Sequence, residues 1–523
     1  MVLAASLLAT PILAHNAAAK TFRYAFQGDL NALDPYTLDE TFTIGALGNV
    51  FEGLTKRDKD LKIIPGLATS WEVMEPTRWR FHLRKGVKFH DGEDFTADDV
   101  VFSCERAMTG GSQFKGNLPA VKQVVKVDDY TVDMILSSPN PILTSQLDTL
   151  FMMSKKWAQA NNAMETQPAS AKELNPGALK ADGTGPFYIV SHEPGVKTVF
   201  KPNTGWWGKR TDNFDEVDFT TIKSDATRVA ALLSGQVDMI EPVPVQAMQK
   251  VNDNPGTKVL SAPELRTVFL TMDQKRDELL FSDVKGKNPF KDVRVRKAFY
   301  QAIDIKAIDS KLMRGLGQPA ALLVTPVVFP EAKDFKRFPY DVAAAKKLMA
   351  DAGYPNGFSL TMHCPNDRYV NDEAICQAVT TMLARINVKV TLKAIPKAQY
   401  FALAGASGGY GTSFGMLGWT PASNDPLEIL TQLLGCRDDK GNGGLFNYGG
   451  YCNPKVDALA KQAMVETDVT KRNALLVEAF KLTTADVGAL PLHQQYLAWG
   501  ISKKIQIVQR PTDPILFYEA HKD

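Results

Sequence analysis

The segment over residues 65–108 constrains the fold more than any other part of the chain, because it encodes strand, turn and helix in close succession. Over residues 79–83, Trp, Phe and Leu alternate with Arg and His, which is the period of a half-buried strand. A Lys-Gly turn and a second short strand over residues 87–90 would complete a hairpin. Thr96 then precedes a helix, and Asp99 is placed to accept from the Thr96 amide in a capping box.

This run, PGLATSWEVMEPTRWRFHLRKGVKFHDGEDFTADDVVFSCERAM, resembles the signature of periplasmic solute-binding proteins that serve peptide, nickel and opine ABC importers. The resemblance extends over nearly the whole mature chain. It implies an α/β protein with the two-lobed periplasmic-binding-protein fold, a hinge, and a first lobe enlarged by an extra subdomain. It also implies a transport receptor that works with a membrane permease and its ATPase subunits.

The length of the chain calls for more than one core. At 523 residues it exceeds a single typical domain, and its strand and helix signals alternate as in α/β lobes. We expect residues 20–54, 184–264 and 492–523 to form the core of lobe I, residues 55–183 its extra subdomain, and residues 265–491 lobe II. Two or three crossings between the lobes imply a hinge.

Composition and charge narrow the class of partner. Apolar residues make up 44% and charged residues 23%, which is ordinary for a soluble globular protein. Sixty basic and 58 acidic side chains leave a net charge of +2, too small to imply a nucleic-acid or anionic-membrane surface. No Cys/His spacing typical of a metal site occurs. We therefore expect a monomer that binds a small solute, with no cofactor, no metal and no nucleic acid.

The N-terminus reads as an export signal. Residues 2–14 are apolar but too short and too Pro-interrupted to span a bilayer, and small residues follow them. We expect a signal peptide over residues 1–19, truncated at its start because no Lys or Arg precedes the apolar run. A buried N-terminal helix is the alternative. An exported, periplasmic, soluble protein is expected.

The five cysteines fit an oxidising compartment. Cys436 and Cys452 flank a Gly-rich loop, and closing about 15 residues stabilises by about 3 kcal/mol in the chain-entropy model. Cys364 ends an apparent strand and Cys376 lies in the next helix, so a second bridge is possible. Cys104 has apolar neighbours at helical spacing and is expected to be a buried thiol.

The segment GMLGWTPASNDPLEIL is the strongest candidate for contact with a ligand. Trp419 offers a broad apolar face, and Ser423, Asn424 and Asp425 supply donors and acceptors near a helix start. Helix capping explains Asp425 equally well. In peptide-binding members of the family, an Asp shortly after this Trp pairs with the amino group of the peptide. Ungapped alignment puts Ala422 there, so either Asp425 substitutes or the solute lacks an ammonium group, as an opine-like or sugar-derived molecule would.

Three further residues complete the predicted site. Arg368 follows a strand end and could grip a carboxylate or phosphate, although an exposed loop arginine is the alternative. Asn447 and Tyr451 resemble residues that face the cleft in relatives.

An enzyme is the rival class, because residues 405–409 match GxSxG. A nucleophile elbow needs a strand before the Ser and a helix after it, whereas here a helix precedes and a strand follows. We therefore expect a flexible Gly loop, no catalytic residues, and a solute that leaves unaltered. A chaperone-like binder of unfolded segments is a third possibility.

Overall fold

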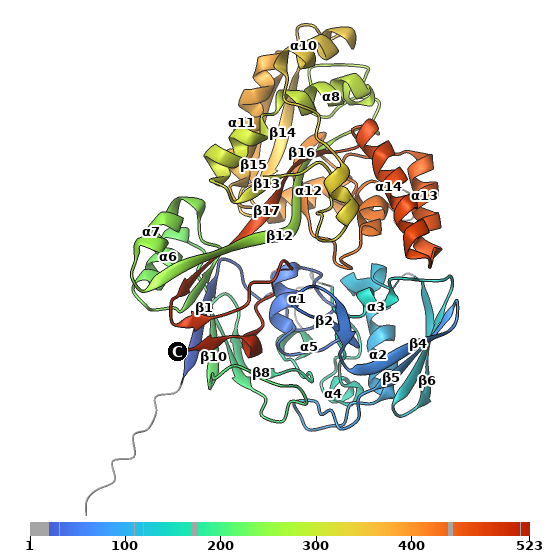
Figure 1. Ribbon diagram of the computed structural model, residues 1–523, viewed down its shortest axis with the longest axis vertical. Helices are drawn as coiled ribbons and strands as arrows, with labels where there is room; N and C mark the ends of the chain where they lie inside the picture. The colour runs from blue at the N-terminus through green and yellow to red at the C-terminus, as the bar shows by residue number, and fades with distance from the viewer. Residues whose placement is uncertain are drawn as a thin grey trace, which may run out of the picture.

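The computed structural model describes residues 20–523 except 31, 109, 119, 169–175, 438–442 and 513. The predicted signal peptide over residues 1–19 lies outside the described residues. Figure 1 shows two lobes, one above the other, which are joined where the chain runs through the long strands β12 (Thr257–Met272) and β17 (Leu490–Ser502). The two-lobed α/β fold predicted from the sequence is confirmed.

One sheet extends through both lobes. Its strands run in the order β15-β14-β16-β12-β17-β11-β1-β10-β9-β8, with β13 beside β17. The further members are β1 (Thr21–Phe26), β8 (Phe187–Glu193), β9 (Lys197–Pro202), β10 (Glu216–Thr221), β11 (Met239–Glu241), β13 (Gly317–Pro319), β14 (Ser359–Pro365), β15 (Lys389–Ile395) and β16 (Phe414–Trp419). The antiparallel pairing of β12 with β17 shifts register between Pro263 and Thr267, so the ribbon is irregular where it passes between the lobes.

A second sheet enlarges the lower lobe, in the order β4-β5-β7-β6. Its strands are β4 (Ala68–Glu75), β5 (Arg78–Leu83), β6 (Val121–Asp128) and β7 (Thr131–Leu136). The predicted hairpin between residues 79–83 and 87–90 is wrong, because β5 pairs with β4 and β7 on its two sides. Residues 87–90 contribute only an isolated bridge, Lys88 to Asp94.

The predicted bond from the Thr96 amide to Asp99, one half of a capping box, is confirmed. The Thr96 amide donates to Asp99 Oδ2 at 2.9 Å, and the helix α2 (Ala97–Met108) follows. Cys104 lies on this helix as a free, buried thiol, as predicted. Burial raises the pKa of the Cys104 thiol to about 12, so it stays protonated and packs as a small apolar side chain.

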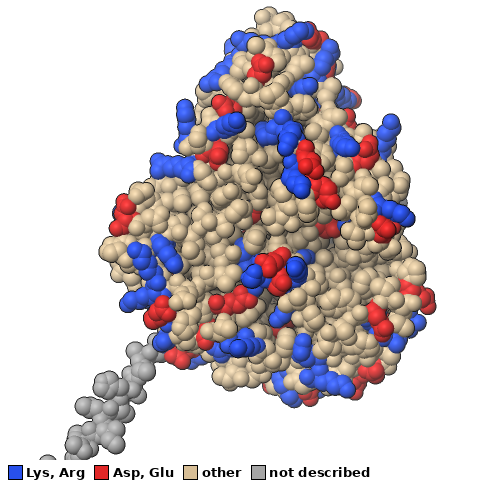
Figure 2. All heavy atoms as spheres, viewed as in Figure 1, with Lys and Arg blue, Asp and Glu red and all other residues tan. Residues whose placement is uncertain are grey.

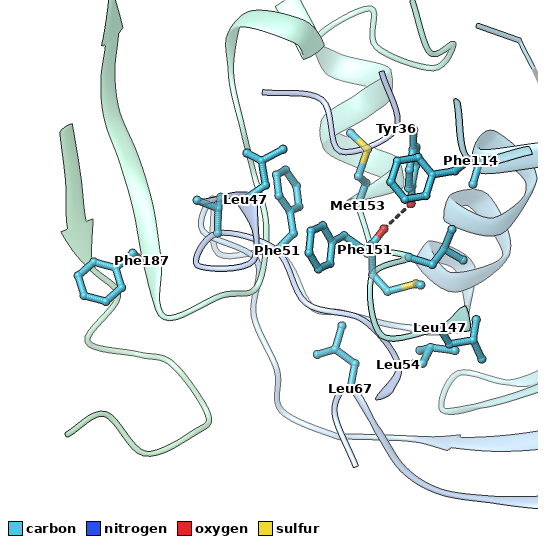
Figure 3. Close-up of a cluster of buried hydrophobic side chains, with 14 of the residues drawn as sticks. Tyr36, Leu47, Phe51, Leu54, Leu67, Phe114, Leu147, Phe151, Met153 and Phe187 are labelled. Atoms are coloured by element: carbon cyan, nitrogen blue, oxygen red, sulfur yellow. Dashed lines mark hydrogen bonds between the residues drawn. The ribbon is translucent and has the colours of Figure 1, made fainter. Parts of the chain in front are cut away.

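Aromatic side chains fill the core of the lower lobe. Phe51 and Phe151 stack with ring centroids 6.3 Å apart, and the buried Tyr36 donates its hydroxyl to the Phe151 carbonyl (Figure 3). The other elements of this half are β2 (Thr55–Arg57), β3 (Ile63–Pro65), β18 (Ile505–Gln506), β19 (His521–Lys522), α1 (Thr41–Leu47), α3 (Leu143–Gln146), α4 (Lys155–Ala160), α5 (Pro176–Leu179), α6 (Asp225–Leu233) and α7 (Met248–Asp253).

The upper lobe packs helices on both faces of its strands, and the period-2 pattern of β12 explains how. Val268 and Leu270 belong to one hydrophobic cluster, whereas Phe269 belongs to another on the opposite face. The first cluster includes residues of α8 (Val293–Ala302), α10 (Val342–Asp351) and α11 (Asp372–Leu383), and the second includes residues of α12 (Lys397–Ala404), α13 (Pro454–Val465) and α14 (Val469–Ala485). The short α9 (Ile305–Ala307) follows α8.

Two disulfides pin segments of the upper lobe. Cys436 and Cys452 are bonded, as predicted, and close the loop that leads into α13. Cys364 and Cys376, whose pairing the sequence left open, are also bonded and tie β14 to α11.

Candidate functional site

The loop that follows β16 is organised by one carboxylate that the sequence analysis missed. Glu428 Oε1 accepts from Trp419 Nε1 at 2.9 Å and from the Ala422 amide at 3.1 Å. Glu428 Oε2 accepts from the Ser423 amide at 3.0 Å and from Ser423 Oγ at 2.8 Å. We call residues 419–428 the Trp419 loop. Its backbone folds around this side chain, which fixes the indole at the end of β16.

Burial raises the pKa of Glu428, and the hydrogen bonds from Ser423, Ala422 and Trp419 oppose that rise by stabilising the charged form. The signal that could have found Glu428 is its place three residues after Asp425, the spacing of a capping box.

Asp425 is engaged inside the upper lobe. Its carboxylate accepts from Arg472 Nη1 at 2.9 Å and from Arg472 Nη2 at 2.7 Å, in a bidentate pair with α14. Asp425 Oδ1 also accepts from the Leu427 amide at 2.9 Å. Only 8% of Asp425 is exposed. These contacts match the capping alternative, and they occupy both oxygens without a solute.

The Trp419 loop meets the lower lobe directly. Arg57, the last residue of β2, donates from Nη2 to the Ser423 carbonyl at 2.9 Å, while its Nε is 2.5 Å from Asp148 Oδ2. The two lobes therefore touch at this loop. Figure 2 shows charged side chains of both signs gathered at the centre of the face, at the level where the lobes meet.

Asp39 adds a second acid from the lower lobe. Its side chain keeps accessible surface, yet surrounding protein raises the pKa of Asp39 to about 7, with the charges of Glu428 and Glu40 adding to the rise. Glu40 caps α1 by accepting from the Thr43 amide. Among the described residues, no side chain donates a hydrogen bond to the Asp39 carboxylate. Asp39 is thus an acid without a hydrogen-bonded cation there, near enough to Glu428 of the upper lobe to be affected by its charge.

Three buried polar atoms without partners among the described residues lie in the Trp419 loop or opposite it on β12. Thr267 stands opposite Trp419 in the register of β12 and β16, so both side chains project from the same face of the sheet. Thr267 is fully buried, and within the described part of the chain its Oγ1 has no hydrogen-bond partner. Thr420 Oγ1 and Asn424 Oδ1 are also buried and without a hydrogen-bond partner in that part of the chain. Buried polar atoms in native proteins are normally satisfied, so these three are available to a solute or to water.

The other predicted site residues divide between two places. Arg368 lies over the ring of Tyr369 at 5.4 Å, and Tyr369 donates to the Gly418 carbonyl, next to Trp419. Asn447 instead donates to the carbonyls of Gly435 and Tyr451 and so braces the disulfide-closed loop. Tyr451 is buried there.

A buried ion pair, unforeseen from the sequence, occupies the irregular part of the crossing ribbon. Arg266 donates to Glu264 Oε1 at 2.8 Å, and Gln495 of β17 donates to Glu264 Oε2 at 2.8 Å. The Leu265 amide bonds to the Pro511 carbonyl of the lower lobe at 2.9 Å. The only sign of this ion pair in the sequence was that Glu264 and Arg266 interrupt an otherwise apolar strand.

The GxSxG segment follows the helix α12 and precedes the strand β16, with Ala406–Gly408 forming a single 3₁₀ turn. This order is opposite to that of a nucleophile elbow. Within the described residues, His, Cys, Asp and Glu do not cluster in threes as metal binding would require. No helix in the same part of the chain combines the length and apolarity that a membrane span needs.

Comparisons with known proteins agree with this architecture. The family model for bacterial extracellular solute-binding proteins, family 5 Middle, matches residues 62–441. The dipeptide-binding protein of Escherichia coli K12 is 28% identical over 490 residues, which are 88% of this chain and 86% of that protein.

Solved structures of two binding proteins share the fold of this chain. The periplasmic binding protein DppA from Helicobacter pylori, in complex with the peptide STSA, has a TM-score of 0.82 at 24% identity and covers 96% of this chain and 98% of its own. The binding protein AgaA from A. tumefaciens R10, in complex with agropinic acid, has a TM-score of 0.77 at 25% identity, with 95% and 96% covered. The chain belongs to the bacterial extracellular solute-binding proteins of family 5.

Proposed function

We propose that the protein captures a peptide or peptide-like solute between its lobes, against Trp419, and delivers it to an importer unaltered. The observation that carries this proposal is the contact of the Trp419 loop with Arg57, because it joins an aromatic platform in one lobe to a charged side chain in the other. The three unpartnered polar atoms beside Trp419 support the same location. Trp419, Ser423, Asn424 and Arg368 are the proposed contact residues.

The charge of the site favours a solute with an ammonium group. Asp39 is unpaired among the described residues, and Glu428 lies near enough to raise its pKa. Closing two lobes over like charges is unfavourable unless a cation enters between them. We propose that Asp39, from the lower lobe, takes the role that an acid at the position of Ala422 has in peptide-binding relatives. The dipeptide-binding protein of E. coli, at 28% identity, supports a peptide.

A non-peptide solute is the second candidate. Ala422 supplies no carboxylate, and AgaA, which was solved with agropinic acid, is 25% identical to this chain. An opine-like solute would present a carboxylate to Arg368 instead.

We propose that closure takes place about the irregular part of the β12–β17 ribbon, with lobe I over residues 20–264 and 492–523, residues 55–183 as its extra subdomain, and lobe II over residues 265–491. The solute drives closure only because it binds the closed form better than the open one. We further propose that the protein acts as a periplasmic monomer, docks on a membrane permease with ATPase subunits, and catalyses no reaction.

Calorimetric titration of wild type with Met-Leu, N-acetyl-Met-Leu and an opine tests the proposal. Met-Leu is expected to bind, and the acetylated peptide at least about tenfold more weakly. Trp419→Ala is expected to weaken Met-Leu binding, whereas Trp71→Ala, in the exposed strand β4, is the matched control. Preference for the opine would replace the peptide by the second candidate. Equal affinity of wild type and Trp419→Ala would remove Trp419 from the site.

A further inference from the structure

A separate pocket in the upper lobe carries an excess of positive charge. Its volume is about 510 Å³, and its charged lining residues are Lys275, Lys291, Arg296, Arg437 and Asp486, with Tyr451 beside them. Its lining shares no residue with the Trp419 loop. The pocket lies between the end of β12, the start of α8, the end of α14, and Arg437 and residues 450–452 at the two ends of the loop closed by the Cys436–Cys452 disulfide.

Arg437 is the central cation of this pocket. Its guanidinium stacks on the ring of Tyr410 at 3.9 Å. Arg437 Nε is buried and has no hydrogen-bond partner within the described residues, while the side chain of Tyr410 interacts with the guanidinium through its ring and its hydroxyl. Burial lowers the pKa of Arg437, and the charges of Tyr410 and Asp273 oppose that fall.

The backbone is shaped to admit this side chain. Gly450 has φ +61° and lies so close to Arg437 that a Cβ at Gly450 would approach Arg437 Nη2 to 2.2 Å. Arg437 follows Cys436, and Gly450 stands two residues before Cys452. The disulfide therefore holds both the cation and the glycine against which it packs.

The other charged groups that line the pocket are engaged elsewhere, and none of them forms an ion pair with Arg437 or Lys275 within the described residues. Asp486 is occupied, because its Oδ2 accepts from Tyr451 at 2.7 Å and from Asn453 at 2.8 Å. Arg296 donates its hydrogen bonds to backbone carbonyls, including Phe290 O at 2.7 Å and Asp486 O.

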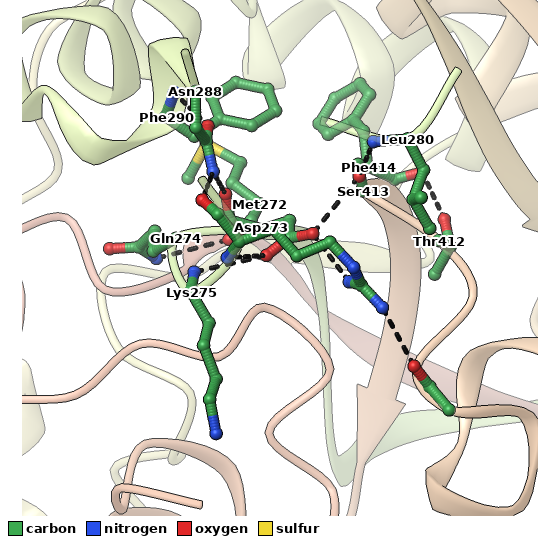
Figure 4. Close-up of polar contacts among 12 residues, drawn as sticks. Met272, Asp273, Gln274, Lys275, Leu280, Asn288, Phe290, Thr412, Ser413 and Phe414 are labelled. Atoms are coloured by element: carbon green, nitrogen blue, oxygen red, sulfur yellow. Dashed lines mark hydrogen bonds and ion pairs between the residues drawn. The ribbon is translucent and has the colours of Figure 1, made fainter. Parts of the chain in front are cut away.

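Lys291 pairs with the exposed Asp277 at 2.5 Å. Lys275 makes no ion pair within the described residues, and its side chain points away from Asp273, which bonds to Arg276 and Ser413 (Figure 4). The Asp273 carboxylate already neutralises Arg276, whose Nη1 lies 2.7 Å from Asp273 Oδ2.

We propose that this pocket binds a small oxyanion of the phosphate or sulfate class, held by the guanidinium of Arg437 and by Lys275. A planar guanidinium offers paired donors that match two oxygens of a tetrahedral anion, and a lysine adds a point charge. Arg296 contributes positive charge from a fixed position. The site is independent of the solute bound between the lobes.

Titration of the intact, oxidised protein with inorganic phosphate and with sulfate, at constant ionic strength in chloride, tests this site. Wild type is expected to show saturable binding. Arg437→Gln and Lys275→Gln are each expected to raise the dissociation constant at least about tenfold. Gly450→Ala keeps every charge but displaces Arg437, and it is expected to weaken binding similarly. Lys347→Gln, on the exposed face of α10, is the matched control and is expected to bind as wild type does.

Lys275 is exposed, so its substitution leaves the fold intact and keeps the test decisive if Arg437→Gln or Gly450→Ala folds poorly. Absence of saturable phosphate or sulfate binding by wild type would overturn the proposal. Unchanged affinity in Lys275→Gln together with either folded Arg437→Gln or folded Gly450→Ala would also overturn it. Binding of Met-Leu between the lobes is expected to be unaffected by all four substitutions, which separates this site from the solute site.

Discussion

Asp425→Ala distinguishes a structural role of this residue from a role in solute binding. The substitution removes both hydrogen bonds to Arg472 and leaves a guanidinium whose side chain is only 10% exposed without its counter-charge. Breaking such a buried pair costs about 3–5 kcal/mol, and the lost bond to the Leu427 amide is included in that range. Denaturation in guanidinium, followed by both far-UV circular dichroism and tryptophan fluorescence, is expected to shift its upper-lobe transition down by about 0.5–1 M.

Two further variants make this test sharp. Asp351→Ala breaks the exposed pair with Lys347 and is expected to cost less than about 1 kcal/mol. The double variant Asp425→Leu/Arg472→Met replaces both charges by apolar groups and is expected to recover most of the loss. A midpoint of Asp425→Ala equal to that of wild type, together with weaker solute binding, would refute the reasoning and return Asp425 to the solute site.

Three other perturbations test separate parts of the structure. Glu428→Gln turns an NH₂ group toward two of the four donors that now bond to the carboxylate. The substitution is therefore expected to destabilise the upper lobe by about 2–4 kcal/mol and to weaken solute binding. An unchanged denaturation midpoint would contradict the role given to this carboxylate. His493 is fully buried, and burial lowers its pKa to about 4. The neutral imidazole therefore contributes fully to the free energy of unfolding above pH 6.5, and about 3 kcal/mol of that free energy is lost as the pH falls to 4. His493→Gln is expected to remove this part of the acid destabilisation, and an identical dependence of stability on pH in the variant would contradict it. Replacing Cys436 and Cys452 together by Ser is expected to cost about 3 kcal/mol in urea denaturation, and no loss would show that the loop is held without the bridge.

Local patterns in the sequence were sufficient for much of the fold. The strands expected before Cys364 and after the GxSxG segment became β14 and β16. The Cys436–Cys452 bridge followed from two cysteines that flank a Gly-rich loop, whereas the pairing of Cys364 with Cys376 was left open. Thr96 and Asp99 specified the start of α2 because a capping box is a local interaction. These features depend on residues close together in the chain.

The errors and omissions arose from contacts between distant residues. The hairpin assigned to residues 79–83 failed because β5 takes β7, some fifty residues later, as a partner, and no local pattern specifies that pairing. Asp425 could not be assigned to the core without knowing that Arg472 of α14 reaches it. Glu428 stands at capping-box spacing from Asp425, but the sequence did not show that the preceding loop would fold around its side chain.

The family and the placement of Trp419 at the end of a strand could thus be predicted, whereas the charges of the site could not. Asp39 and Arg57 lie more than 350 residues from the Trp419 loop in the chain, and they reach it only through the docking of one lobe on the other.

Mass spectrometry of small molecules released by denaturing the protein, after purification from an exporting host, tests the central claim most directly. The account predicts about one equivalent of an unaltered, amine-bearing, peptide-like solute from wild type, and much less of it from Asp39→Asn and Trp419→Ala. A wild-type protein that releases no solute, yet converts added Met-Leu to products, would contradict it.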